Sequence, residues 1–193
     1  MAKRVFFSFH YQDALDFRAS VVRNHWLNNP ESQAAGFFEA PAWTATEPQD
    51  LARAKQLSDQ ALAGTSSTCV LIGTQTYQQP QVRYEIMRSI KNGNPVSGIH
   101  INSLKGRNGN TKSRGKNPFK YLGIEFSGSG YRAMLWELID DRWQRYNELD
   151  RSFSYICQRV KPEQRGKFLE LAALVPVRDW MVNAGYKNLA KWL

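Results

Sequence analysis

Apolar segments of strand length that alternate with segments of helical spacing constrain the fold of this chain most strongly. RVFFSF (4–9) is a nearly unbroken apolar and aromatic run, and TCVLIG (68–73) and PVSGIHIN (95–102) are also predicted to be strands. Strands of a parallel sheet have such sequences because helices cover both of their faces. AAGFFEA (34–40) is a candidate for a further, short strand. We therefore expect one buried sheet.

Three segments between these strands carry helical signals. The segment 13–27 is followed by 48–64, which has a proline near its first turn and a glycine at its end, and by 80–92. In the first of them, apolar side chains recur every three or four positions, at Leu15, Ala19, Val22 and Trp26. Strand–helix alternation with short connections predicts an α/β fold in which helices cover both faces of a parallel sheet.

Past the basic segment near residues 105–116 the pattern changes, and NPFKYLGIEFSGSG (117–130) is rich in turns and aromatic residues. YRAMLWELIDDRWQRYNEL (131–149) fits a helix with an aromatic stripe and fits equally a hairpin that turns at Asp140-Asp141. The last segment, 162–193, predicts two helical segments separated near Pro176. Four of the six tryptophans lie beyond residue 130, so we expect this tail to pack on the sheet.

The length and composition suit a single domain. With 193 residues, of which 42% are hydrophobic, the chain can bury one sizeable core. We expect one domain over 1–193, with an α/β core in 1–125 and an aromatic-rich C-terminal extension in 126–193 that packs on it.

The expected compartment is the reducing cytoplasm, without a membrane partner. No apolar run reaches the roughly 18 residues of a membrane helix, and the first residues lack the cleavage region of a signal peptide. Cys69 and Cys157 form neither a metal-binding spacing nor a disulfide framework. Because Cys69 lies in an apolar strand, we expect it to be a buried, inert thiol.

A basic segment follows the last predicted strand. The net charge of the chain is +9, and SLKGRNGNTKSRGKNP contains no acid and five bases, Lys105, Arg107, Lys112, Arg114 and Lys116. Its three glycines predict a mobile loop. The charge could attract phosphates or could only keep the loop solvated. We favour the solvated loop without a nucleic-acid partner, because no zinc-finger, RNP or helix-turn-helix signature accompanies it.

Glu85 is the single acid of the segment 80–92. On a helical wheel with about 100° per residue, it falls roughly 110° from the centre of the apolar face, at the border between core and solvent. Pro80 suits the first turn, so the helix would begin above the carboxyl edge of the sheet, where open α/β sheets bind ligands. A half-sheltered carboxylate there is a catalytic candidate. The alternative, which spacing alone favours, is a surface glutamate beside Arg88.

Other reactive side chains give weaker patterns. Ser8, His10 and Asp13 have the groups of a hydrolytic triad, but side chains so close along a strand end diverge in direction. We expect His10 to line a pocket or to cap a helix. His25 and His100 lie far from any metal-like partner, so no metal site is predicted.

Aromatic residues at the same edge allow two interpretations. Strand alternation turns Phe7 and Phe9 to the face opposite Phe6 and Ser8, and such phenylalanines are more often core than pocket. Trp43, in the loop before the second helix, could shield a nucleotide or could only cover the sheet edge.

Three ordered motifs resemble the TIR-like domains of bacterial defence proteins, namely KRVFFSFHYQDALDFR, TCVLIGTQTY with VRYEIMRSI, and GIHIN with GKNPFKYLG. The resemblance spans essentially the whole chain and is to the ThsB-like TIR proteins of the Thoeris antiphage system. It implies a flavodoxin-like TIR fold that consumes NAD+ through one glutamate, a position that Glu85 of VRYE matches. Many catalytic TIR domains carry Trp-Cys where this chain has Gln81-Val82, which removes a stacking aromatic.

The resemblance also implies the substrate site. The end of the first strand, FFSFH, matches the family motif whose residues line the nucleotide pocket. The candidate substrate-binding residues are Phe6, Ser8, Phe9, His10, Trp43 and Arg83.

One carboxylate is sufficient for the implied chemistry. Nicotinamide in NAD+ is a cationic leaving group, so cleavage of its bond to ribose needs no proton donor, and a nearby carboxylate can offset the charge of the oxocarbenium-like state. Capture by water would give ADP-ribose, and capture by an atom of the same molecule would give a cyclic ADP-ribose. The resemblance implies the cyclic product, with NAD+ as substrate and no further cofactor.

The resemblance implies partners as well. They are a separate effector that the cyclic nucleotide activates, a phage-derived trigger, and other copies of the chain in the active state. The sequence leaves two other functions open: a non-catalytic TIR-type interaction module and, less favoured, a nucleic-acid-binding protein that uses the basic loop.

Overall fold

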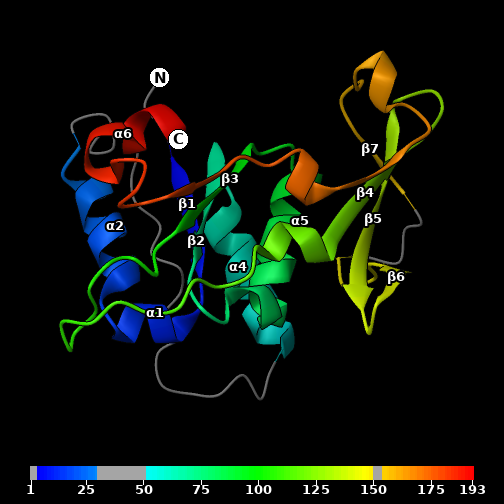
Figure 1. Cartoon of the computed structure of the whole chain (residues 1–193). Helices are drawn as coiled ribbons and strands as arrows, with labels where there is room; N and C mark the ends of the chain where they lie inside the picture. The colour runs from blue at the N-terminus through cyan, green and yellow to red at the C-terminus, as the bar shows by residue number, and fades with distance from the viewer. Residues whose placement is uncertain (1–3, 30–50, 150–153) are drawn as a thin grey trace.

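The computed structural model describes residues 4–29, 51–149 and 154–193. Four strands form a parallel sheet in the order β1 (Val5–Phe9), β2 (Ser67–Ile72), β3 (Val96–His100) and β9 (Val177–Asp179). The three predicted strands are confirmed, and the C-terminal region extends their sheet with β9 (Figure 1). The candidate strand at 34–40 lies outside the described residues.

Helices cover both faces of this sheet, as predicted. The described α-helices are α1 (Tyr11–Leu15), α2 (Arg18–Leu27), α4 (Leu51–Leu62), α5 (Pro80–Lys91) and α6 (Gly185–Trp192). The pair α2 and α6 lies on one face and the pair α4 and α5 on the other (Figure 1). Within the described part of the chain, no helix is long and apolar enough to cross a membrane.

The prediction of one helix over 13–27 was wrong, because α1 and α2 are separate. Phe17, between them, has a φ of 66°. This left-handed conformation cannot continue a right-handed helix, so the chain changes direction there. The other two predicted helices correspond to α4 and α5.

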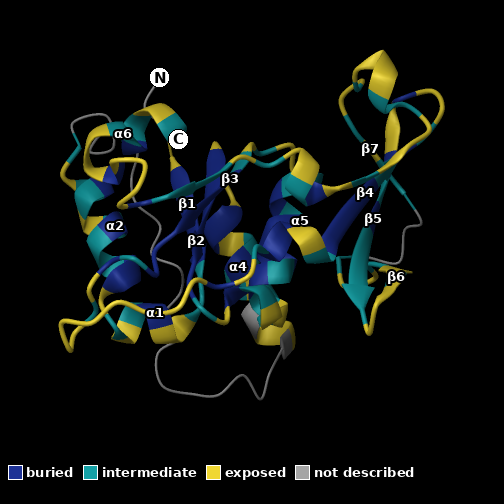
Figure 2. Cartoon of the chain, viewed as in Figure 1, coloured by how far each residue is buried: buried dark blue, intermediate teal, exposed yellow. Residues whose placement is uncertain are grey.

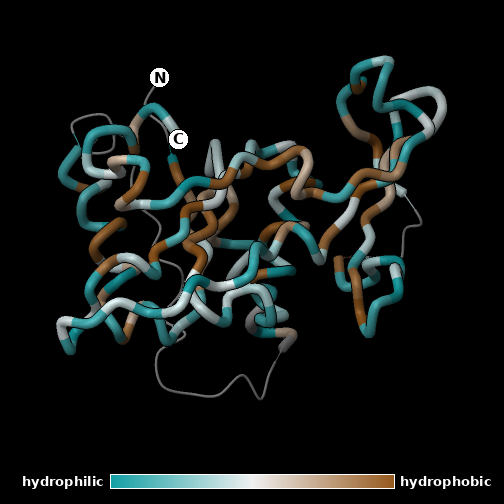
Figure 3. The backbone as a smooth tube through the Cα atoms, in the orientation of Figure 1, coloured by the Kyte–Doolittle hydropathy of each residue, from teal (hydrophilic) through white to brown (hydrophobic). Residues whose placement is uncertain are grey.

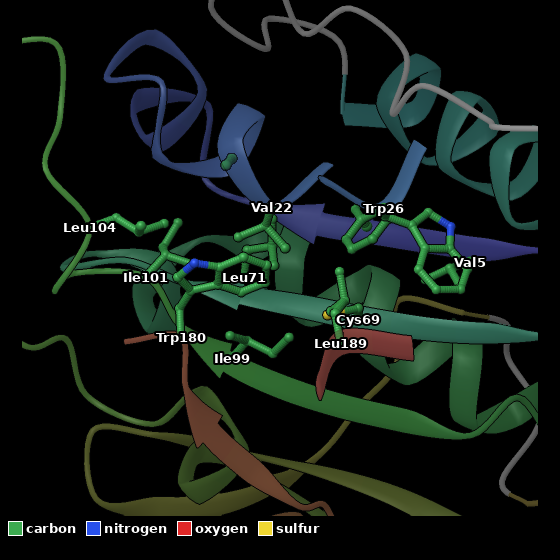
Figure 4. Packing of buried hydrophobic residues seen from close by; sticks show 12 residues of the cluster. Val5, Val22, Trp26, Cys69, Leu71, Ile99, Ile101, Leu104, Trp180 and Leu189 are labelled. Carbon is green, nitrogen blue, oxygen red and sulfur yellow. The ribbon is translucent and has the colours of Figure 1, made fainter. Parts of the chain in front are cut away.

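Alternate positions of each strand contribute to clusters on opposite faces, as the period of two in a strand requires. On the face of α2 and α6, the cluster combines Phe7, Cys69, Leu71 and Ile99 with Val22, Trp26 and Leu189 (Figure 4). On the face of α5, Val70 and Ile72 pack with Val82 and Ile86. All six residues of β2 are buried, and the apolar colouring of the central strands follows this burial (Figures 2 and 3).

The predicted inert thiol is confirmed as buried. Cys69 is completely inaccessible, and burial raises the pKa of its thiol to about 12. It therefore stays protonated near neutral pH and cannot act as a thiolate nucleophile there.

A second, antiparallel sheet lies beside α5. Its strands are β4 (Leu122–Phe126), β5 (Arg132–Ile139), β6 (Arg142–Arg145), β7 (Tyr155–Ile156) and β8 (Phe168–Glu170). Their order is β6-β5-β4-β8, and β7 pairs with β5. The inner residues of β4 and β5 join the α5 cluster, notably Ile124, Phe126, Ala133 and Leu135.

The second sheet decides between the alternatives in the C-terminal third. The hairpin at 131–149 is correct: β5 and β6 meet at Asp140 and Asp141, whose φ angles are 47° and 58°. Two successive positive φ values are those of a type I′ turn. The helical segment predicted before Pro176 was wrong, because that stretch contains β8 and short 3-10 turns, whereas α6 provides the helical segment after it.

The basic loop is tethered at several points and does not extend freely from the fold. Arg18, which is 2% exposed, donates from Nε to the carbonyl of Leu104 at 2.9 Å and from Nη2 to that of Asn110 at 2.6 Å. Asn102 donates from Nδ2 to the carbonyl of Ser113 at 2.8 Å. Buried side chains from the core thus hydrogen-bond the backbone of this glycine-containing segment at three points.

Candidate active site

Helix α5 carries Glu85 across one face of the parallel sheet. Pro80 occupies its first turn, where a fixed φ and a missing N–H are both tolerated. Val82, Ile86 and Met87 are buried in the cluster shared with β2 and the second sheet. This apolar side fixes the rotation of the helix, which turns Glu85 toward β1 and α4.

The Glu85 carboxylate accepts three hydrogen bonds from neutral side chains. Oε2 accepts from Ser8 Oγ at 2.6 Å, and Oε1 accepts from Ser58 Oγ at 2.9 Å and from Gln81 Nε2 at 2.9 Å. The donors come from β1, α4 and the first turn of α5, so three separate parts of the fold meet at this carboxylate.

The predicted border position of Glu85 was wrong, since the residue is only 1% exposed. The helical wheel considered α5 alone, but α4 packs along its flank and supplies Ser58 to the carboxylate. The alternative of a surface pair with Arg88 was also wrong. Arg88 Nε instead pairs with Asp59 Oδ1 at 2.9 Å.

Burial has a large effect on the acidity of this group. It raises the pKa of Glu85 from its ordinary value of 4.5 to about 7, and the hydrogen bonds from Ser8, Gln81 and Ser58 oppose the shift. Near neutral pH the group is therefore poised between its neutral and ionised forms, a property common among functional carboxylates.

Two donors to Glu85 were missed from the sequence as site residues. Ser58 is a small polar residue on the same helical stripe as Ala61 and Leu62, which are buried. A polar residue within such a stripe is a usable signal for a buried partner. Gln81 entered the sequence argument only as the replacement for an aromatic residue, and its hydrogen bond to Glu85 gives it a positive role.

The structure separates the phenylalanines that were grouped as substrate-binding candidates. Phe6 lies on the face of Ser8 and is buried against Ala61 and Leu62 of α4. Phe9 packs against the cluster on the opposite face. Strand alternation thus places Phe6, but not Phe9, on the side of Glu85.

The candidate Arg83 does not lie beside Glu85. Arg83 points toward the second sheet, where its Nη1 lies 3.6 Å from Glu137 Oε2 and its Nε donates to the carbonyl of Tyr77 at 3.4 Å. Trp43 lies outside the described residues.

His10 lines a polar cavity of about 380 Å³ at the carboxyl ends of β1 and β2, together with Gln12, Asp13, Thr74, Gln75, Lys112 and Ser113. Burial and the charge of Lys112 lower the pKa of His10, so its imidazole is neutral at pH 7. Burial raises the pKa of Asp13 to about 6. Since Ser8 donates to Glu85, the suspected Ser8–His10–Asp13 triad is not assembled. Among the described residues, no His, Cys, Asp and Glu side chains cluster as metal ligands.

Comparison with known proteins gives a consistent family. Residues 6–106, which contain all of β1 but its first residue, together with β2, β3 and Glu85, match the family described as "Thoeris protein ThsB, TIR-like domain". The chain is 47% identical over 195 residues to ThsB1 of Bacillus cereus (strain MSX-D12), whose name describes it, provisionally, as a cyclic ADP-D-ribose synthase. That alignment covers 100% of both chains. This chain therefore belongs to the ThsB family of TIR-like Thoeris proteins.

Proposed function

We propose that this protein consumes NAD+ by cleaving the bond between nicotinamide and ribose, and that it makes a cyclic ADP-ribose-type signal in antiphage defence. The observation that carries the proposal is the Glu85 carboxylate, which α5 holds beside Ser8 of the first family motif at 2.6 Å. Family membership and the name of the full-length relative support the product class. The signal would act on a separate effector, and a phage-derived cue would start the reaction.

The reaction needs negative charge near the ribose rather than an acid. As the bond to nicotinamide breaks, the electron pair leaves with the ring nitrogen and positive charge develops at the ribose carbon. An ionised Glu85 stabilises that charge, and its buried surroundings strengthen the interaction. An oxygen or nitrogen atom of the same molecule then bonds to this carbon. The attacking group releases one proton, from the hydroxyl itself or, when a ring nitrogen attacks, from the amino group of the same ring. The products are a cyclic ADP-ribose, nicotinamide and one proton.

Gln81 gives the substrate a route to the carboxylate. Its amide donates to Glu85 Oε1 from the first turn of α5, and its side chain is only half-buried. A ribose hydroxyl that replaced this amide would make a hydrogen bond to the same oxygen. Ser8 and Ser58 would continue to hold the carboxylate, so substrate binding would require the displacement of one side chain.

The decisive experiment measures nicotinamide released from NAD+ by the purified protein, with and without extract from phage-infected cells. Glu85→Gln keeps the size of the side chain and removes its charge, so turnover should fall at least about 100-fold. Glu163→Gln removes an exposed acid and is the matched control, with unchanged turnover expected. Mass spectrometry then separates the cyclic product from ADP-ribose, which is heavier by one water.

Turnover by Glu85→Gln equal to that of the parent protein would remove Glu85 from the reaction. Release of no nicotinamide by the parent under any condition would instead favour the non-catalytic interaction module.

A further inference from the structure

Helix α4 supplies one of the donors to Glu85, and a small apolar cluster anchors that helix to the sheet beneath it. Ser58 is completely buried and donates to Glu85 Oε1. In the described structure, the apolar cluster between α4 and β1 consists of Phe6, Ala61 and Leu62, and the last two of these lie in the final turn of α4. The position of the Ser58 hydroxyl therefore depends on what else fixes α4.

Polar contacts fix α4 to α5 at the residue after Ser58. Asp59 Oδ1 accepts a hydrogen bond from Tyr84 Oη at 2.9 Å and lies 2.9 Å from Arg88 Nε. Tyr84 is buried, and burial raises the pKa of its hydroxyl to about 12, so the hydroxyl keeps its proton and acts as the donor. Because Asp59 directly follows Ser58 and Tyr84 directly precedes Glu85, this contact and the Ser58–Glu85 hydrogen bond join the same turns of the two helices.

The charged side chains around these two helices form ion pairs with one another, namely Lys55 with Glu148, Asp59 with Arg88, and Arg83 with Glu137. Burial raises the pKa of Tyr146, which interacts with several of these groups, so this hydroxyl is neutral as well. Among the described residues, the pKa of Glu85 depends on burial and on its three hydrogen bonds, without a contribution from a charged side chain. A change in the position of Ser58 therefore acts directly on the titration of Glu85.

We propose that Asp59 and Tyr84 are positioning residues for Glu85, because their hydrogen bond holds α4 against α5 and thereby keeps the Ser58 hydroxyl on the carboxylate. Both act through Ser58 and not on the carboxylate itself. The Ser58 bond opposes the shift that burial causes in the pKa of Glu85, so its loss would leave less of the carboxylate ionised near neutral pH. A role in catalysis rests on the proposed function, whereas the effect on the carboxylate does not.

The experiment follows the Glu85 carboxyl group by NMR, in protein labelled with carbon-13 at the glutamate carboxyl groups, between pH 5 and 9 and without NAD+. The Glu85 signal is the one that Glu85→Gln lacks. Tyr84→Phe removes only a neutral hydroxyl and should raise the titration midpoint by about 0.3–1 pH unit, the equivalent of one hydrogen bond. Tyr186→Phe makes the same change at an exposed tyrosine of α6 and should leave the midpoint unchanged.

Two further variants test whether the effect passes through Ser58. Ser58→Ala should raise the midpoint directly, and Tyr84→Phe should add no further shift to it, because the hydroxyl that Tyr84 positions is gone. Asp59→Ala breaks the same contact from the side of α4 and should also raise the midpoint. The loss of its negative charge alone would lower the midpoint, so a rise identifies the lost position of α4. Circular dichroism checks that each variant is folded.

Nicotinamide release in extract from phage-infected cells extends the test to catalysis. At pH 7, turnover by Tyr84→Phe should fall about 1.5- to fivefold, because a smaller fraction of Glu85 is ionised. The loss should nearly vanish at pH 9, where the carboxylate is ionised in both proteins. A loss of equal size at both pH values would be that of a general structural defect and would overturn the positioning role in catalysis.

The outcomes are distinguishable. An unchanged midpoint in folded Tyr84→Phe, or the same shift with and without Ser58, would overturn the proposal. If Tyr84→Phe does not fold, the midpoint of Asp59→Ala decides in the same way. If the parent protein releases no nicotinamide while the midpoint still rises in Tyr84→Phe, the positioning of the carboxylate stands and the proposed function fails.

Discussion

At the residue scale, the unusual property of Glu85 is that, among the residues the structure describes, its hydrogen-bond donors are all neutral. Ser8, Ser58 and Gln81 orient the carboxylate without supplying a positive charge. A neighbouring cation would lower the pKa and also neutralise the field that the carboxylate exerts on a developing cation. The observed arrangement keeps the full negative charge available for the ribose when Glu85 is ionised, at the cost of a raised pKa.

This raised pKa predicts how activity depends on pH. Because the ionised form stabilises the reaction and the pKa is about 7, kcat/KM should rise as pH increases through 7 and level off above it. Ser8→Ala removes a hydrogen bond that lowers the pKa, so the midpoint should move to higher pH. Initial rates of nicotinamide release between pH 5.5 and 9 would test both, with Glu163→Gln as the unshifted control. A flat profile across this range would be inconsistent with Glu85 as the titrating group.

The same pKa predicts an effect on stability. The folded-state pKa of about 7 lies above the ordinary value of 4.5, so between these values the folded protein binds more protons than the unfolded chain. Stability from this group is therefore fully present below pH 4.5 and is lost as pH rises through 7. Glu85→Gln should accordingly be more stable than the parent at pH 8, by up to about 3 kcal/mol.

Urea unfolding of both proteins at pH 5 and pH 8 would measure this difference. The advantage of Glu85→Gln should be much smaller at pH 5, where the parent carboxyl is protonated in the folded state. A variant that is less stable than the parent at both pH values would show that the ionised carboxylate is not a source of instability.

At the element scale, the turn between β5 and β6 places two successive residues in the left-handed region. Asp140 and Asp141 have positive φ values of 47° and 58°, and a type I′ turn favours glycine at its second central position. Asp141→Gly should stabilise the protein by about 0.5–1 kcal/mol, because glycine adopts this conformation without steric cost. Asp141→Ala is the control and should give no such gain. A Gly variant less stable than the parent would contradict this account.

Predictability from sequence differed among the elements for a physical reason. The strands β1, β2 and β3 were evident because both of their faces are covered and their apolar runs stand out. In contrast, β8 lies within a stretch rich in leucine and alanine, residues that favour helices, and it is a strand because it pairs with β4. The three residues of β9 are likewise defined by pairing with β3.

The candidate active site could likewise be predicted from the sequence only in part. The position of Glu85 on α5 could be read from the spacing and from the resemblance, since both depend on local order. Its burial could not, because that depends on how α4 packs beside α5, which no single helical pattern contains. The contact with Ser8 joins residues 77 positions apart and required the fold.

The basic loop provides another test at this scale. Arg18 is buried and bonds to two loop carbonyls and to Asp16, so Arg18→Met should destabilise the protein by about 2–4 kcal/mol.

Serine substitutions at three charged residues of the loop, Lys112, Arg114 and Lys116, should change stability by less than about 1 kcal/mol and leave NAD+ affinity nearly unchanged. Thermal unfolding and substrate titration at low and high salt would distinguish the two variants. A large, salt-sensitive loss of affinity in the triple variant would show that the loop attracts the dinucleotide.

At the scale of the whole molecule, α5 connects the two sheets. Its apolar residues pack in one cluster with Val70 of the parallel sheet and Ile124 of the second sheet. Arg83 of the same helix pairs with Glu137 of β5. A displacement of either sheet would therefore reach the helix that carries Glu85, which gives the fold a physical means to control the carboxylate.

The same geometry predicts that the purified protein is nearly inactive until it is assembled or rearranged. Glu85 is 1% exposed and both carboxylate oxygens accept hydrogen bonds, so NAD+ cannot reach the group while Gln81 keeps its place beside it. An activator would shift the population toward a second conformation in which the carboxylate is accessible. A restraint of this kind also suits the proposed activity, because unrestrained NAD+ consumption would harm the cell that makes the protein.

Turnover per subunit should therefore be low at high dilution, and should rise at least about tenfold with protein concentration or with extract from phage-infected cells. Glu85→Gln in the same extract controls for other NAD+-consuming enzymes. Rapid turnover by dilute protein without an activator would show that the described conformation already admits the substrate.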